Sequence, residues 1–337
     1  MTTDPTDRAL AEAGLFELDQ VLAGPGGRSV ADAAAEVGLP VETVVAQRRA
    51  LGFADPVGDE PVINAGELEG LRATRELLDA GLPEEQLLDF LRVVGRNLAQ
   101  AADSLRSLFG DGYLFGGEAD VAAGVPFVEL ATRLADRTGP ALGSIFTAHL
   151  RQLIRSEVVG RAPATGLEVP GTREVTVSFA DLVGFTKLGE EVAATDLGHI
   201  ATRFAALASD AARPPVRLVK MIGDAAMFVA PAAAPVVAAA LRLVESVDAE
   251  GEAFPAVRAG CATGSALNSG GDWFGQPVNL ASRVTSVARP GSVLVTDETR
   301  EAAGDGFAWS RAGRHRIRGV EGLVGLHRAR PLAPEPI

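Results

Sequence analysis

The sequence predicts two domains: an all-α bundle over residues 1–159 and an α+β, ferredoxin-like domain over residues 173–330, joined by a linker at 160–172. The chain is 337 residues long, which is enough for two separate cores. Apolar residues recur at helical spacing in the first half, whereas the second half mixes alternating apolar runs with helical ones. Between the halves glycine and proline are frequent, which is typical of a linker between domains.

The first half is expected to be helical throughout. Leucine, valine and alanine recur every three or four residues from about residue 7 to 108, and clusters of glycine and proline interrupt the pattern. After a glycine-rich break at 110–124, helical spacing resumes, with Pro140 as a boundary or kink. The expected helices cover residues 29–37, 41–51, 67–80, 84–109 and 125–159.

Two of these helices, 29–37 and 41–51, flank a Gly-Leu-Pro turn and have the layout of a helix-turn-helix. DNA binding is therefore one hypothesis. Residues 1–60, however, carry 11 acidic side chains against four arginines, and DNA phosphates would repel such a surface. The charge argues against this hypothesis.

The second half is expected to form a sheet with helices. Its order of strand, helix, two strands, helix and strand is that of the ferredoxin-like split unit, and it predicts an antiparallel sheet with helices on one face. We expect these six elements, then a helix, a strand and shorter elements to about Arg330, at residues 174–180, 189–212, 216–221, 225–230, 235–248, 256–264, 278–287 and 292–296.

Composition argues against several classes of protein. The net charge of −13 argues against a nucleic-acid or anionic-membrane partner, because phosphate groups would be repelled. The one cysteine, Cys261, excludes an internal disulfide framework and is compatible with a reducing cytoplasm. The N-terminal residues lack the basic start and apolar run of a signal peptide, so we expect a cytoplasmic protein. Prolines and Arg242 interrupt the apolar stretch 225–244, which predicts a buried strand and a helix and no membrane span.

Two aspartates stand where carboxylates could bind a cation. Asp181 follows an alternating apolar run that predicts a strand, and Asp224 follows Gly223 between two short apolar runs that predict a hairpin with a tight turn. If the two strands are neighbours, both carboxylates lie at one edge of the sheet. Hard oxygen ligands there would suit Mg²⁺ bound to a nucleotide polyphosphate.

A third stretch carries polar residues on one face of a helix. Asn279 and Arg283 are four residues apart in a segment expected to be helical, so both project from the same side. Such a pair can bind an anionic, phosphate-rich ligand. Taken one at a time, the residues of these three stretches have simpler explanations, as a turn former, a solvated strand residue or a helix cap. Their occurrence together in this order favours a nucleotide site.

The three stretches read Phe-x-Asp-Leu-x-Gly-Phe-Thr, Lys-x-x-Gly-Asp-x-x-Met and Asp-x-x-Gly-x-x-Val-Asn-x-Ala-Ser-Arg. In this order they resemble the catalytic domain of class III nucleotidyl cyclases of the adenylate type, over residues 174–330. The resemblance implies that Asp181, Asp224 and the backbone carbonyl of Leu182 hold two Mg²⁺ or Mn²⁺ ions. It implies that Lys220 and Asp272 read the adenine edge. Because guanylate cyclases place Glu and Cys-type residues there, this pair favours ATP over GTP.

The resemblance also implies how the substrate is held. Asn279 would orient the ribose, and Arg283 would stabilise charge on the phosphate in flight. The loop amides of Gly184, Phe185 and Thr186 would cradle phosphate oxygens. Arg318 aligns loosely with a late basic phosphate contact of the family, although a solvated arginine at a strand end is an equal alternative.

The reaction implied is attack of the ribose 3′-oxygen on the α-phosphorus, with pyrophosphate leaving and cyclic AMP as product. In the family the site forms between two catalytic domains. Because this chain carries both halves of the residue set in one domain, we expect a homodimer with two equivalent, shared active sites.

The helical half resembles the regulatory domain of actinobacterial-type soluble cyclases, which implies that it controls how the catalytic domains meet. Four histidines are available for a pH response, but the sequence does not identify the signal or the sign of regulation: His149, His199, His315 and His327. Two alternatives to an adenylate cyclase are open. One is a guanylate or relaxed-specificity cyclase, and the other is a nucleotide-binding signalling module that has lost turnover.

Overall fold

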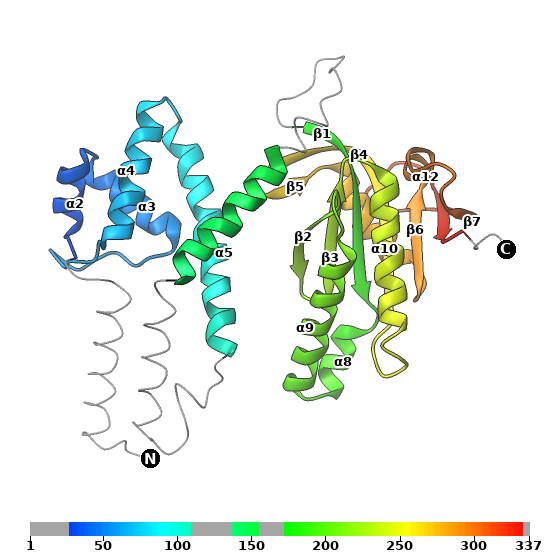
Figure 1. The fold of residues 1–337 in the computed structure, drawn as a ribbon. Helices are drawn as coiled ribbons and strands as arrows, with labels where there is room; N and C mark the ends of the chain where they lie inside the picture. Colours follow the sequence, from blue (N-terminus) through cyan, green and yellow to red (C-terminus); the bar gives the residue numbers. More distant parts are fainter. Residues whose placement is uncertain (1–26, 109–136, 155–171, 333–337) are drawn as a thin grey trace. The chain divides into compact units, whose positions relative to one another are not determined.

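The structure is a computed structural model that describes residues 27–108, 137–154 and 172–332 (Figure 1). The chain divides into two compact units, residues 1–154 and 155–337. The expected helical pattern before residue 27, the glycine-rich break at 110–124 and the linker up to residue 171 lie outside the described residues.

The first unit contains the expected helices. Their bounds differ from the prediction by at most two residues: α2 (Val30–Val37), α3 (Val41–Leu51), α4 (Ala65–Asp79) and α5 (Glu84–Leu108). Ser29 caps α2 by accepting a hydrogen bond from Asp32 N, and Asn64 and Glu67 form a capping box at the start of α4. These local signals explain why α2 begins at Val30 and α4 at Ala65.

A small apolar core holds α2, α3 and α4 together. Its buried residues are Val30, Ala33, Ala34, Leu39, Val44, Ile63, Leu68 and Leu71. The helix α5 approaches the end of α3 at Gly95, where an added Cβ would lie 2.4 Å from the carbonyl oxygen of Leu51. Glycine at this position lets the two backbones approach closely.

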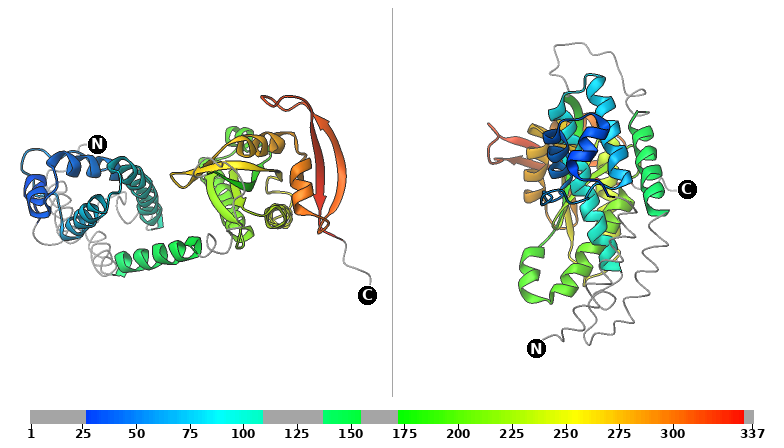
Figure 2. Two further views of the ribbon diagram at one scale, coloured as in Figure 1. Left: turned by 90° about the horizontal axis from the view of Figure 1, so that it is seen from above. Right: turned by 90° about the vertical axis from the view of Figure 1, so that its left-hand side faces the viewer.

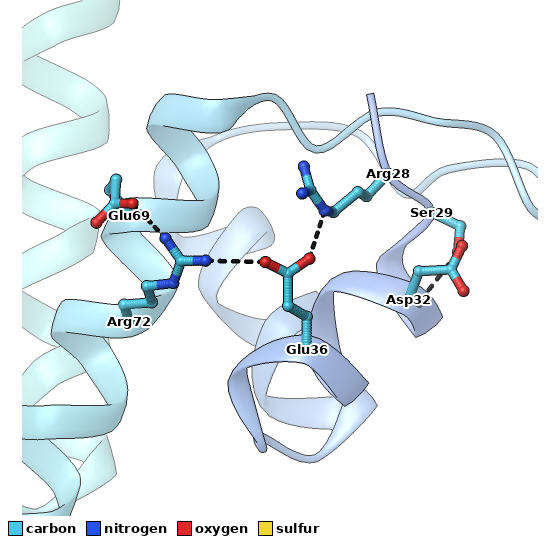
Figure 3. Close-up of polar contacts among 6 residues, drawn as sticks. All are labelled: Arg28, Ser29, Asp32, Glu36, Glu69 and Arg72. Carbon is cyan, nitrogen blue, oxygen red and sulfur yellow. Dashed lines mark hydrogen bonds and ion pairs between the residues drawn. The ribbon is translucent and has the colours of Figure 1, made fainter. Parts of the chain in front are cut away.

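Ion pairs join the surfaces of α2 and α4 (Figure 3). Glu36 on α2 accepts from Arg28 Nε at 2.5 Å and from Arg72 Nη2 at 2.8 Å, and Arg72 also pairs with Glu69 on its own helix. We call these four residues the Glu36 cluster. Its side chains are one-third or more exposed, so it orients the helices and contributes little to stability.

Residues 137–154 form a further helix, which covers part of the helix expected at 125–159 and includes Pro140. The rest of that expected helix lies outside the described residues. Among the described residues, no helix combines the length and the apolar character that crossing a membrane requires.

The second unit is built on one mixed sheet (Figure 1). The strand order is β2-β3-β1-β4-β6-β8-β7, and the short β5 pairs with β4. The strands are β1 (Thr172–Leu182), β2 (Arg217–Ile222), β3 (Ala225–Ala230), β4 (Val257–Ser269), β5 (Asp272–Phe274), β6 (Ser292–Thr296), β7 (Ala308–His315) and β8 (Val324–Arg330). The helices are α8 (Phe185–Glu191), α9 (Ala194–Ala211), α10 (Ala233–Asp248), α11 (Gln276–Val287) and α12 (Asp297–Ala303).

The first four strands confirm the predicted ferredoxin-like unit. β1 lies between β3 and β4, β2 lies beyond β3, and all three pairings are antiparallel. The predicted tight turn at Gly223-Asp224 is also confirmed, because β2 ends at Ile222 and β3 begins at Ala225. The stretch 225–244 forms a strand and a helix, as expected.

Three sequence-based details were wrong. The sheet is not purely antiparallel, because β4 and β6 pair in parallel. Helices cover both faces, not one: α9 and α10 pack against Ala180 and Phe228, whereas α11 packs against Phe179 and Met227. The helix expected at 189–212 is two helices, α8 and α9, because the backbone is extended at Val192 and Ala193.

The coverage on both faces explains the burial of polar residues in β1. Thr176 and Ser178, which alternate with apolar residues, are fully buried. Thr176 Oγ1 lies 2.8 Å from Thr263 Oγ1 on β4, so its hydroxyl is satisfied inside the sheet. Cys261 is also buried, and burial raises the pKa of its thiol to about 12, which agrees with a small apolar role.

Figure 2 shows the β7–β8 hairpin, orange to red, at one end of this domain.

Candidate active site

Two aspartates meet where β1 ends and the β2–β3 hairpin turns. Asp181 is the penultimate residue of β1 and stands opposite Ala225, the residue that follows Asp224. The Leu182 N–H donates to the carbonyl oxygen of Asp224 at 3.1 Å, which fixes the hairpin turn to the end of β1. Gly223 in this turn has φ = +60°, a conformation that glycine adopts without strain. The structure therefore brings the two predicted carboxylates together.

The two carboxylates repel each other. Burial raises the pKa of Asp224, and the negative charge of Asp181 raises it further, while a backbone hydrogen bond and the charge of Arg258 act in the opposite direction. A raised pKa means that the ionised form of Asp224 is disfavoured in this position. A cation bound between the two groups would relieve this cost.

Arg258, near the start of β4, contacts Asp181 of this pair. Its Nη2 and Nε lie 2.9 and 3.2 Å from Oδ2 of Asp181, and its Nη1 donates to the Ser286 carbonyl oxygen at 3.1 Å. Arg258 was not among the site residues predicted from the sequence. Its signal there is a lone charged residue in the apolar run from Val257 to Ala262, within a predicted strand.

The donors fit a cation that keeps part of its coordination for a ligand. Among the described residues, no three or more His, Cys, Asp or Glu side chains gather as a metal site. The available protein oxygens are those of Asp181, Asp224 and the backbone carbonyl of Leu182, whose side chain is buried in the core. Mg²⁺ is typically bound by one or two carboxylates together with substrate phosphates, so the set suits a metal that arrives with a polyphosphate.

The loop after Leu182 leads directly into a helix. Gly184 adopts φ = +77° and caps α8, which begins at Phe185. The N–H groups of the first helical turn have no acceptor within the helix. Phe185 and Thr186 belong to this turn, next to the carboxylate pair, so the structure places the predicted phosphate loop beside the predicted metal ligands.

Lys220 and Asp272 form an ion pair between β2 and β5, through Lys220 Nζ and Asp272 Oδ2. The second oxygen of Asp272 accepts from the N–H of Trp273 at 2.8 Å. A β-bulge in the β2–β3 pairing falls between Leu218 and Lys220, and bulges often change the direction of a side chain near a site. Both charged side chains are about one-third exposed, at 35% and 28%, so they remain open to a ligand.

The helix α11 carries Asn279 and Arg283. Asn279 is exposed, and Arg283 is partly buried against the β7–β8 loop. A Cβ added to Gly319 in that loop would lie 2.8 Å from Arg283 Nη1, so the guanidinium rests on the backbone there. Arg318, the neighbour of Gly319, is exposed. The structure thus brings the loop with Arg318 to Arg283.

The predicted residues form three separate groups. They are the carboxylate pair with the loop at Gly184, the Lys220–Asp272 pair, and α11 with the β7–β8 loop. Within the described residues, no hydrogen bond or ion pair joins Asp181 or Asp224 to Lys220, Asp272, Asn279 or Arg283. Arg258 links the first and third groups indirectly, from Asp181 to Ser286 in the last turn of α11.

Comparison with protein families identifies the class of each half of the chain. The family model for the adenylate and guanylate cyclase catalytic domain matches residues 167–327, and the model for the adenylate cyclase regulatory domain matches residues 4–154. The sheet domain is therefore a nucleotidyl cyclase catalytic domain.

Similar proteins identify the family within this class. A pH-sensitive adenylate cyclase of Mycobacterium tuberculosis is 42% identical over 302 residues, which cover 87% of this chain and 75% of the relative. An adenylate cyclase of Streptomyces griseus is 31% identical over 297 residues, or 87% of this chain and 72% of the relative. Among solved structures, the adenylyl cyclase CyaB of P. aeruginosa is 25% identical with a TM-score of 0.41, over 47% of this chain and 94% of that chain. The chain belongs to the family of adenylate cyclases that carry a regulatory domain before the catalytic domain.

Proposed function

We propose that this adenylate cyclase converts ATP to 3′,5′-cyclic AMP and pyrophosphate in the cytoplasm, at two equivalent active sites shared by the chains of a homodimer. The observation that carries the proposal is the set of three residue groups on one domain. A carboxylate pair with an excess negative charge lies beside a phosphate-binding turn, and within the described residues no hydrogen bond or ion pair joins it to the base-reading and ribose-reading groups. Two copies related by a twofold axis would complete two sites.

The carboxylate pair would hold two divalent cations, Mg²⁺ or Mn²⁺, together with the carbonyl oxygen of Leu182. When bound, such ions would lower the pKa of the ribose 3′-hydroxyl and neutralise the charge of the leaving pyrophosphate. The contribution of the chain is to place Asp181 and Asp224 side by side at the end of β1. The N–H groups of Gly184, Phe185 and Thr186 would bind phosphate oxygens next to them.

Lys220 and Asp272 would select adenine by hydrogen bonding. The adenine edge presents an acceptor at N1 and a donor at N6, which match an ammonium donor and a carboxylate acceptor. Guanine presents the reverse order, a donor at N1–H and an acceptor at O6. The Lys220 donor would then face a donor, and the Asp272 acceptor would face an acceptor. Because the Lys220–Asp272 pair is already formed, the two groups are oriented before the base arrives.

Asn279 and Arg283 would act on the ribose and the transferred phosphate. Asn279 is exposed on α11, so its amide is free to orient the sugar. The guanidinium of Arg283, supported by the Gly319 backbone, would stabilise the charge that develops on the α-phosphate. Arg318 would add a second positive charge from the same loop.

The proposed domain arrangement is a regulatory domain over residues 1–159, a linker at 160–172 and a catalytic domain over 173–330. The division of the chain into two compact units and the two family matches support it. In this proposal the helical domain controls how often the two catalytic domains meet in the active arrangement.

The shared site can be tested by mixing two inactive variants of the full chain. Asp181→Ala removes a metal ligand and Arg283→Ala removes the phosphate contact, so each homodimer should be inactive. After equal mixing, half of the dimers are mixed, and one of their two sites has a complete residue set. We expect recovery of about a quarter of the wild-type cyclic AMP formation.

The matched control mixes Asp181→Ala with Asp224→Ala. Both changes fall in the metal half, so every site lacks one ligand and no recovery is expected. If the first mixture stays inactive while both variants fold and bind ATP, the shared site is wrong. If wild-type chain binds ATP but forms no cyclic AMP with either metal, the silent signalling module replaces the cyclase.

A further inference from the structure

We infer that Arg258 is a positioning residue for the metal half of the active site: it holds Asp181 by one carboxylate oxygen and is itself anchored to α11. The inference rests on the proposed function, because it takes Asp181 as a metal ligand. Arg258 is not expected to touch the substrate. Its role is to keep the Asp181 carboxylate in one orientation.

The contact with Asp181 is one-sided. Nε and Nη2 of Arg258 both point to Oδ2, at 3.2 and 2.9 Å. Within the described residues, Oδ1 of Asp181 accepts no hydrogen bond, so this oxygen remains available to a cation. A guanidinium that binds one oxygen with two nitrogens restricts rotation of the carboxylate.

The sheet places the two residues opposite each other. Asp181 on β1 and Arg258 on β4 are register partners in the antiparallel pairing. Their side chains are only 26% and 28% exposed, so the pair is shielded from solvent more than the Glu36 cluster. An ion pair in such surroundings is costly to break from one side, because the remaining charge loses its partner.

The other end of Arg258 is fixed by α11. Nη1 donates to the Ser286 carbonyl oxygen at 3.1 Å. This carbonyl lies in the last helical turn, so no N–H group of the same helix is available to donate to it. The helix is fixed in turn to the sheet, since Thr285 Oγ1 shares its proton between the Phe179 carbonyl oxygen at 3.0 Å and the Ala281 carbonyl oxygen of its own helix at 2.8 Å. An added Cβ on Gly260 would lie 2.3 Å from Thr285 N, so the backbones are in close contact. Arg258 is therefore anchored to a helix that is itself packed closely against the sheet.

The first test measures metal binding and not turnover. Mn²⁺ binding to the full chain is titrated with 3′-deoxy-ATP present, which has no 3′-hydroxyl to react. We expect Arg258→Gln to weaken Mn²⁺ binding about 10- to 100-fold, the usual effect of removing a partner of a metal ligand. Arg258→Lys keeps a positive donor group, so its affinity for Mn²⁺ should lie between those of Arg258→Gln and the wild-type chain. Binding of the nucleotide without metal should be unchanged.

Arg203→Gln is the matched control. Arg203 also binds a carboxylate through Nε and Nη2, that of Glu250 on the same domain, but neither residue belongs to the proposed site. The control should leave Mn²⁺ binding unchanged. The positioning role is overturned if Arg258→Gln binds Mn²⁺ as tightly as the wild-type chain. It is also overturned if Arg258→Gln and Arg203→Gln lose Mn²⁺ affinity equally.

The second test uses the mixed dimers of Asp181→Ala and Arg283→Ala. Their one complete site takes Asp181 from the chain that carries Arg283→Ala. Arg258→Gln on that chain should reduce the recovered activity at limiting metal, and saturating Mn²⁺ should restore part of it. The same change on the Asp181→Ala chain should alter the recovered activity by no more than about twofold.

The two tests separate two ways of failing. Equal losses from both placements would mean that Arg258 acts through the general fold, and would overturn the inference. If the parent mixture recovers nothing, the shared site fails, whereas the Mn²⁺ titration still decides the role of Arg258. The placement on the Asp181→Ala chain also shows whether a chain with Arg258→Gln folds and pairs.

Discussion

The two halves of the chain treat charged groups differently. In the Glu36 cluster of the helical domain, two carboxylates, Glu36 and Glu69, are matched by two arginines, and all four side chains are at least one-third exposed. In the catalytic domain, Asp181 and Asp224 share the single positive charge of Arg258, and the pair with Arg258 is about one-quarter exposed.

The difference separates a structural charge group from a functional one. The Glu36 cluster is neutral and solvated, so it needs no further ligand (Figure 3). The carboxylate pair keeps an excess negative charge in a partly buried position. The raised pKa of Asp224 shows that ionising this group is unfavourable in the folded protein. Perturbed groups of this kind concentrate at functional sites. A cation is the chemical species that would balance the group.

The largest expected effect comes from removing one charge of the excess pair. Asp224→Asn keeps the shape of the side chain but removes a metal ligand, and we expect cyclic AMP formation to fall on the order of 10³-fold. The same change should raise the thermal unfolding temperature at pH 7 slightly, because it removes the cost of burying the Asp224 charge and the repulsion with Asp181. Loss of activity and gain of stability together would mark a functional charge.

The stability change caused by Asp224→Asn should depend on pH. The pKa of Asp224 is raised in the folded state, so its ionisation costs stability above the folded pKa, and the cost disappears as the pH falls through that pKa towards the unfolded value. The stability advantage of Asp224→Asn should therefore shrink on acidification. Glu174→Gln, at an exposed position of β1, is the control and should show neither effect. An equal gain from both variants would contradict the repulsion.

A second prediction concerns a pair whose charges balance. Lys220 and Asp272 neutralise each other, so replacing them should change which base is read and not how the metal binds. With Lys220→Glu and Asp272→Cys together, we expect kcat/KM for ATP to fall on the order of 100-fold, because two hydrogen bonds to adenine become mismatched. GTP should gain relative to ATP.

The measurement is a competition between ATP and GTP at fixed Mn²⁺. The single variant Lys220→Glu serves as control, since it leaves Asp272 without its partner and should lower activity with both nucleotides. Unchanged preference for ATP in the double variant would show that these residues do not read the base. The metal concentration at half-maximal rate should stay the same in every case.

The sequence predicted most of the elements because their signals are local. Alternation in β1, the Gly223-Asp224 turn and the capping residues of α2 and α4 act over a few positions. The convergence of Asp181 and Asp224 could also be predicted, since a hairpin beside a strand places both at one edge.

Long-range features could not be read in this way. The parallel pairing of β4 with β6 and the position of α11 on the second face depend on packing between distant segments. The bulge before Lys220 leaves no clear pattern in the sequence. Arg258 became recognisable only when the register placed it opposite Asp181.

The smallest expected effect is in the Glu36 cluster. Glu36→Gln removes the carboxylate that joins α2 to α4 through Arg72 and also accepts from Arg28. Because the pairs are solvated, we expect a loss of less than about 1 kcal/mol in the free energy of unfolding, and a smaller loss at high salt. Denaturant unfolding of the full chain at low and high salt measures it.

Glu76→Gln is the control for this prediction. Glu76 is exposed on α4 and forms no ion pair within the described part of the helical domain, so its loss should have no measurable effect. If Glu36→Gln costs several kcal/mol and the loss persists at high salt, the cluster is not a solvated balance of charges. The contrast between a solvated group and a partly buried one would then fail, because the Glu36 charge would stabilise the fold as a shielded ion pair does. A small, salt-sensitive loss beside the stability gain from Asp224→Asn would instead show that only the catalytic domain maintains an unbalanced charge.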